Sequence, residues 1–203
     1  INPWDGPVQI VFKGRSYKKL PHQVGVWPAI ISFSLAAVYT LTDLAPDDPD
    51  RLAWVASGYW LFTFAMCGVF GKDWLHKGEG FTVFFDLLAQ LSPLRTSPFG
   101  MRLPGQAIIA QAPRGLSVAL FAVVMLALGS FDGLNETFWW MSQLGINPLE
   151  FPGRSAIAWQ NRFGMGGAIT LLTTGFAACV WLGLAIINQT SCLPVLFCRV
   201  ALS

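Results

Sequence analysis

"FGMGGAITLLTTGFAACVWLGLAII", residues 163–187, is a run of 25 residues without Asp, Glu, Lys, Arg or His. An α-helix needs about 20 apolar residues to cross the roughly 30 Å hydrocarbon core of a bilayer. The stretch therefore predicts a transmembrane helix. The composition agrees, since 54% of the 203 residues are hydrophobic and 12% are charged, about half of the roughly 25% charge that is usual in soluble domains.

Three more stretches, residues 24–42, 52–70 and 115–131, also lack those five residue types. The last is short for a span, and we expect it to take a further turn from the "DGLNETFWW" that follows. A fifth run, "FTVFFDLLAQL" at residues 81–91, is shorter still and contains Asp86, so it predicts an interfacial or re-entrant helix. The predicted fold is an all-α integral membrane protein, with about four transmembrane helices in one membrane domain over residues 1–203.

The charges between these stretches predict the orientation of the chain. With four crossings, ten Lys and Arg fall on the side of the N-terminus and three on the other. Because cytoplasmic segments carry the excess of positive charge, we expect a cytoplasmic N-terminus and a periplasmic loop over residues 132–162 in a bacterial inner membrane. A fifth crossing at residues 81–91 would reverse the side of every later segment and reduce the asymmetry to eight against five.

Several classes of function are disfavoured by composition. The net charge of +2 and the absence of a basic stripe argue against a nucleic-acid partner. The four Cys have no CxxC spacing and predict neither a disulfide framework nor a zinc site. Both histidines, His22 and His76, lie outside the predicted spans, which argues against haem or pigment ligation. The sequence thus requires no cofactor or metal.

The predicted outer loop, residues 132–162, contains two carboxylates four residues apart, Asp132 and Glu136. In a helix they would share a face, as paired acid–base catalysis requires, although two exposed acids have the same spacing. Asp-Gly at 132–133 indicates a turn, and residues 135–144 predict a short helix on the membrane. Phe138, Trp139 and Trp140 would anchor that helix at headgroup level. A shaped cap for contact with a partner is the third interpretation of this loop.

The inner segment "FGKDWLHKGEG", residues 70–80, contains a second cluster of titratable residues. His76 with Asp73 forms a candidate general base with an orienting carboxylate, and Glu79 could complete a metal site. A solvated helix start at the interface, or a partner-binding site, would use the same residues. Asp86, within the apolar run, is expected to face protein, water or the interface because a carboxylate is costly in hydrocarbon.

The last span is rich in small residues, including Gly164 and Gly167. Small residues let helix backbones approach closely. We expect this helix to pack tightly, either inside the protein or against another subunit.

At "FGKDWLHKGEGFTVFFDLLAQLSPL" (70–94) and "SFDGLNETFWWMSQLGINPLEFPGRS" (130–155) the chain resembles a family of bacterial multi-pass membrane proteins known as fenitrothion hydrolase-like. The resemblance implies organophosphate ester hydrolysis by a membrane-bound complex. It also implies a longer protein with further membrane segments, including a histidine-bearing helix near the C-terminus. The chain is therefore expected to be a fragment of such a protein.

Together these features predict a non-catalytic accessory or scaffold subunit of a larger inner-membrane complex, for example an energy-transducing one. Its expected partners are membrane lipids and other integral membrane subunits. The alternative is a membrane-embedded ester hydrolase that uses Asp132 and Glu136, or Asp73, His76 and Glu79.

Overall fold

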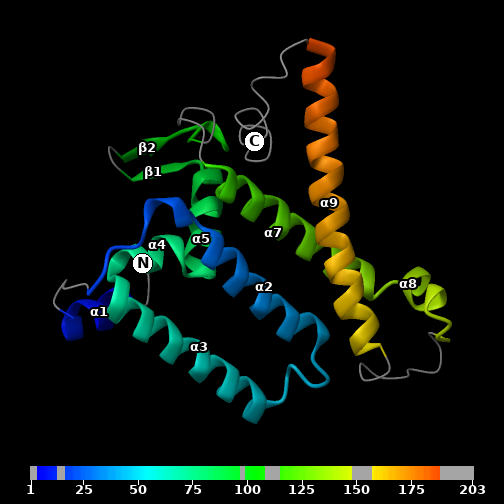
Figure 1. Cartoon of the computed structure of the whole chain (residues 1–203), viewed down its shortest axis with the longest axis horizontal. Helices are drawn as coiled ribbons and strands as arrows, with labels where there is room; N and C mark the ends of the chain where they lie inside the picture. The colour runs from blue at the N-terminus through cyan, green and yellow to red at the C-terminus, as the bar shows by residue number, and fades with distance from the viewer. Residues whose placement is uncertain (1–3, 13–16, 97–98, 108–114, 148–156, 188–203) are drawn as a thin grey trace.

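The computed structural model describes the chain except for residues 1–3, 13–16, 97–98, 108–114, 148–156 and 188–203. The described part is mostly helical, with one short β-hairpin (Figure 1). Its elements in chain order are α1 (Asp5–Phe12), η1 (His22–Val24), α2 (Trp27–Thr42), α3 (Pro49–Phe70), α4 (Lys72–Lys77), α5 (Gly80–Leu91), β1 (Leu94–Thr96), β2 (Phe99–Met101), α7 (Leu116–Asn135), α8 (Phe138–Gln143) and α9 (Ala158–Ile187).

Three of the described helices are long and apolar enough to cross a membrane: α3, α7 and, over Ala158–Gly183, α9. The first predicted span, residues 24–42, corresponds to the 16-residue helix α2, which begins three residues later than predicted and is shorter than the three helices above; the 3₁₀ helix η1 precedes it. Gly25 separates them because its φ of 51° lies in the left-handed region that ends a right-handed helix. Pro28 then occupies the first turn of α2, where a missing N–H costs nothing.

The third predicted span does take a further turn. α7 continues to Asn135, four residues beyond the predicted end at 131, so Asp132 and Gly133 lie in a helix and the predicted turn at these residues is wrong. The structure ends α7 and begins a separate helix, α8, at Phe138. Thr137 caps α8, because its side chain accepts a hydrogen bond from the Trp140 N–H at 3.2 Å. Residues 148–156 of the predicted cap lie outside the described residues.

α7 is the central helix of the described structure. It packs against both α2 and α9, and it has the highest buried share of the three long helices. One stripe of α9 faces it, with Asn161, Met165 and Val180 buried. They are 4 and 15 residues apart, about one and four turns of an α-helix, so they lie on one face of α9. Most of the other described residues of α9 are exposed or half-buried, and only 11% of its apolar window is buried.

α5 crosses α2 at very short range. A Cβ added at Gly80 would lie 2.8 Å from the backbone N of Phe33 and 2.9 Å from the backbone O of Ala29. Glycine is therefore required at this crossing, since any side chain would force the two backbones apart. α3 makes its main helix contacts with α4 and α1. The hairpin of β1 and β2 follows α5 and lies near the start of α7, while α8 lies at its end (Figure 1).

Candidate functional site

The inner cluster divides into exposed and buried parts. Asp73 and His76 are exposed on α4, and the carboxylate that reaches His76 is Asp86 on α5, with 4.0 Å between Nδ1 and Oδ2. Both of these side chains are more than half exposed. Among the described residues, no three His, Cys, Asp or Glu side chains converge as metal ligands.

Glu79, by contrast, is only 2% exposed. It is the N-cap of α5, and its carboxylate accepts hydrogen bonds from the backbone N–H of Phe81, at 3.1 Å, and of Thr82. The Thr82 hydroxyl donates to the same carboxylate, and the Tyr59 hydroxyl of α3 donates to Oε1. A buried carboxylate is costly unless such donors satisfy it. Three of these donors belong to α5 itself, and the Tyr59 hydroxyl is the one that joins the carboxylate to α3.

Ser32 of α2 completes this junction from the other side. Its hydroxyl donates to the carbonyl of Gly78 at 3.1 Å and accepts from the N–H of Gly80 at 3.0 Å. Helices α2, α3 and α5 thus meet at the α4–α5 turn, on polar groups that the sequence places far apart. Tyr59 lies halfway along α3, so the turn reaches the middle level of that helix.

A pocket of about 240 Å³ lies where the end of α2, the end of α7, α8 and the start of α9 meet. We call it the outer pocket. It is lined by Leu41, Thr42, Asp43, Asn135, Glu136, Met141, Ile157, Ala158 and Asn161. Its lining residues at the end of α2 and at the end of α7 are at least 92 residues apart in sequence, from Asp43 to Asn135, so local pattern does not reveal the pocket.

Two asparagines of the outer pocket differ in their hydrogen bonding. Asn161 is buried, and its Oδ1 accepts from the indole N–H of Trp140 at 2.9 Å. Asn135 is 7% exposed, and its Oδ1 has no hydrogen-bond partner among the described residues. An unsatisfied buried acceptor costs about 1–3 kcal/mol. Asn135 is therefore the residue of this pocket whose presence the packing alone does not explain.

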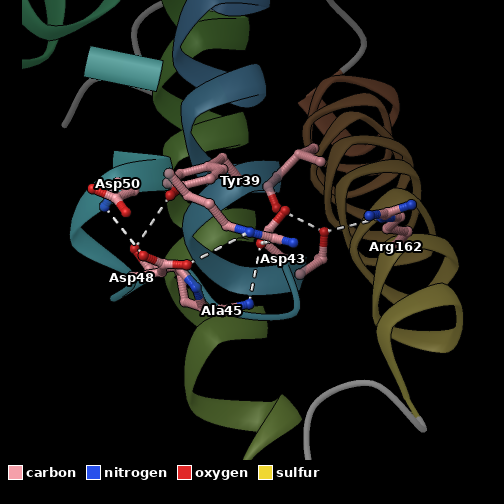
Figure 2. Close-up of polar contacts among 10 residues, drawn as sticks. Tyr39, Asp43, Ala45, Asp48, Asp50 and Arg162 are labelled. Atoms are coloured by element: carbon pink, nitrogen blue, oxygen red, sulfur yellow. Dashed lines mark hydrogen bonds and ion pairs between the residues drawn. The ribbon is translucent and has the colours of Figure 1, made fainter. Parts of the chain in front are cut away.

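The rim of the outer pocket carries an ionic network (Figure 2). Asp43 Oδ1 accepts from the N–H of Ala45 at 3.1 Å and from Nη1 of Arg51 at 3.0 Å. Arg51 Nε also lies 3.9 Å from Oδ2 of Asp48. The Ala45 N–H and the Arg51 guanidinium both favour the ionised carboxylate and outweigh partial desolvation, so the pKa of Asp43 is lowered from its usual value.

Arg162 approaches this rim from α9 (Figure 2). Its Nε donates to the Thr42 hydroxyl at 3.3 Å, and that hydroxyl donates to the Val38 carbonyl at 2.6 Å. The guanidinium also lies over the Trp159 ring, 5.1 Å from its centroid. Arg162 thus couples the start of α9 to the end of α2 while it stays exposed.

The predicted carboxylate pair is exposed at the end of α7, and only Glu136 of the two lines the outer pocket. Phe138 and Trp139 are exposed by 70% and 61%. Trp140 instead turns inward, edge-on to Phe131.

The two glycines singled out in α9 have opposite surroundings. A Cβ at Gly164 would lie 2.7 Å from both Phe131 and Trp140, whereas a Cβ at Gly167 meets nothing within 4 Å. Gly164 therefore serves packing inside the chain, and Gly167 faces outward.

Fold and sites together define a helical protein whose described part has three helices able to cross a membrane, a buried polar junction at the α4–α5 turn and a polar pocket at one end of α7. Comparison of the chain with protein-family models, curated proteins and solved structures finds no match.

Proposed function

We propose that the protein is a non-catalytic accessory or scaffold subunit of a larger complex in a bacterial inner membrane, and that the outward face of α9 packs against a helix of another subunit. The N-terminus would be cytoplasmic and the outer pocket periplasmic. The distribution of Lys and Arg along the chain supports this orientation.

The observation that carries the proposal is the free face of α9. Gly167, Thr170 and Thr174 lie opposite the seam with α7 and are exposed. Thr170 donates its hydroxyl to the carbonyl of Gly166 at 2.8 Å, and Thr174 donates to that of Thr170 at 2.7 Å. The face therefore has small side chains whose donors are satisfied, and such faces allow close helix packing in lipid.

The test is purification in mild detergent, followed by mass spectrometry of the chains that co-purify. We expect stoichiometric integral membrane subunits with the natural protein, and their loss or strong depletion with Gly167→Leu. Gly58→Leu is the matched control, since Gly58 is an exposed glycine of α3 whose Cβ also meets nothing within 4 Å. A solitary monomer, or equal depletion by both variants, would contradict the proposal.

One observation favours the alternative, a membrane-embedded hydrolase of organophosphate esters. Glu136 lines the outer pocket, where it could act as a general base for water. Ester cleavage by the purified protein, lost in Glu136→Gln but retained in His76→Ala, would support this alternative. If both variants still cleaved the ester, Glu136 would not be the general base of this hydrolase.

A further inference from the structure

We propose that the lysine cluster, formed by the exposed side chains of Lys18, Lys19 and Lys72, binds the phosphate group of an anionic membrane phospholipid. The cluster lies where α3 ends and α4 begins, at the opposite end of the molecule from α8 (Figure 1). Such binding requires a chain in a membrane, but neither a partner subunit on α9 nor a particular orientation of the chain.

The fold brings these lysines together from two distant parts of the sequence. The backbone N–H of Lys18 donates to the carbonyl of Val69 at 2.8 Å, in the last turn of α3, and Lys72 begins α4 three residues later. Leu20 is buried in the same apolar cluster as Leu75 of α4. The backbone on either side of Lys19 is therefore fixed against the junction of α3 and α4.

The positive charges of the lysine cluster are not neutralised within the described structure. None of the three ammonium groups makes an ion pair with a described residue. Asp73, which follows Lys72, is exposed as well, so three Lys and one Asp leave a formal charge of +2 on this surface. An ammonium group has three donors and no acceptor. The partner of the cluster must therefore be an anion that supplies acceptor oxygens.

The surface beside the lysine cluster favours a lipid headgroup as that anion. α1 packs against the last turns of α3, since a Cβ added at Gly68 would lie 2.9 Å from the Phe12 ring. The two helices expose apolar side chains here: Ile10, Val11, Phe62 and Val69. Tyr17, next to the cluster, is 84% exposed, as aromatic residues at headgroup depth are.

Unpaired cations at the border of an apolar surface suit a molecule that has both an anionic headgroup and acyl chains. Lys and Arg beside a membrane helix attract anionic lipids for this reason. A nucleic acid or an acidic peptide would satisfy the charges but leave the apolar side chains of α1 and α3 uncovered.

The binding test is native mass spectrometry of the purified full chain with added phosphatidylglycerol or phosphatidylcholine of identical acyl chains. Both lipids have a phosphate group, but only phosphatidylglycerol has a net negative charge. We expect its adducts at roughly 25-fold lower lipid concentration, because two net charges at about 1 kcal/mol each give about 2 kcal/mol, and 1.4 kcal/mol is tenfold in affinity. Equal adduct formation would overturn the proposal. If glycerol 3-phosphate at equal concentration displaced the lipid completely, the ligand would be a soluble phosphate, and the lipid assignment would be wrong.

Variants in the same assay test the residues. Lys18→Gln, Lys19→Gln and Lys72→Gln should each lower the preference for phosphatidylglycerol about fivefold, and Asp73→Asn should raise it by a similar factor. All four side chains are exposed, so the fold should survive each change, and circular dichroism verifies this. A preference that persists when all three lysines are replaced would refute the assignment.

Arg51→Gln is the matched control. It removes the same charge from the opposite end of α3, where two aspartates already pair with the guanidinium. The preference for phosphatidylglycerol should therefore stay close to that of the natural protein. An equal fall in Arg51→Gln and Lys72→Gln would show a response to total charge alone, and the lysine cluster would not be the site.

Discussion

Replacing Tyr59 by Phe removes a single hydroxyl, the one that α3 donates to the buried carboxylate of Glu79. Hydrogen bonds to charged groups contribute about 1.5–3 kcal/mol, and the low exposure of Glu79 means that water does not replace the lost donor. One kcal/mol shifts the unfolding temperature of a chain of this length by about 2–4 °C. We therefore expect Tyr59→Phe to lower Tm by roughly 4–8 °C, working from about 2 kcal/mol.

Glu79→Ala should cost more than Tyr59→Phe. It removes the N-cap of α5, which is worth about 1 kcal/mol, and it leaves the Tyr59 hydroxyl without its acceptor at about 1–3 kcal/mol. In the double variant the second penalty disappears, because no hydroxyl is left to be unsatisfied. The two single effects should therefore sum to more than the effect of the double variant.

The measurement is thermal unfolding in one detergent, followed by circular dichroism at 222 nm. Tyr39→Phe is the matched control, since the Tyr39 hydroxyl donates to the neutral carbonyl of Pro46 at 3.3 Å and should matter less. Equal shifts for Tyr59→Phe and Tyr39→Phe, or strictly additive single effects of Tyr59 and Glu79, would refute the description of Glu79 as a buried tie between α3 and α5.

Gly164→Ala should lower Tm, because the new Cβ would lie 2.7 Å from two aromatic rings. Gly167→Ala should leave Tm nearly unchanged, because there is open space around the new methyl group. An unchanged Tm in Gly164→Ala would contradict the packing described for Gly164. The Ala45 N–H and Arg51 lower the pKa of Asp43 in the folded protein. The ionised carboxylate therefore stabilises the fold fully at pH values above 3.8, its pKa in the unfolded chain. This stabilisation is lost as the pH falls through the lower pKa of the folded protein. Unfolding scans between pH 5 and pH 2 should therefore show a component of acid destabilisation that Asp43→Asn lacks, and identical acid limbs for the two proteins would count against this assignment.

The long helices follow from hydropathy, because a run such as residues 163–187 has no other stable arrangement than a buried or membrane helix. The residues at which these helices begin and end are predicted less well by hydropathy. α9 begins at Ala158, ahead of the charged Arg162, since a helix can continue past the apolar region on which the prediction was based. Gly25 ends η1 through a backbone angle that the residue type permits but does not dictate.

The candidate sites were the least predictable part. The sequence places Glu79 beside Asp73 and His76, yet the fold buries it and leaves the other two exposed. The partners of Glu79 come from α3 and α5, and only the polar Tyr59 within an apolar span gave any signal of a tertiary contact. The outer pocket brings together residues from four helices, and no spacing rule relates them.

The shortness of α2 has a consequence for the bilayer itself. At 16 residues and about 1.5 Å per residue, α2 is about 24 Å long, some 6 Å less than the average hydrocarbon core. A bilayer that met both ends of this helix would have to thin beside it. In that arrangement the headgroups would lie close to Thr42 and Asp43, at the rim of the outer pocket.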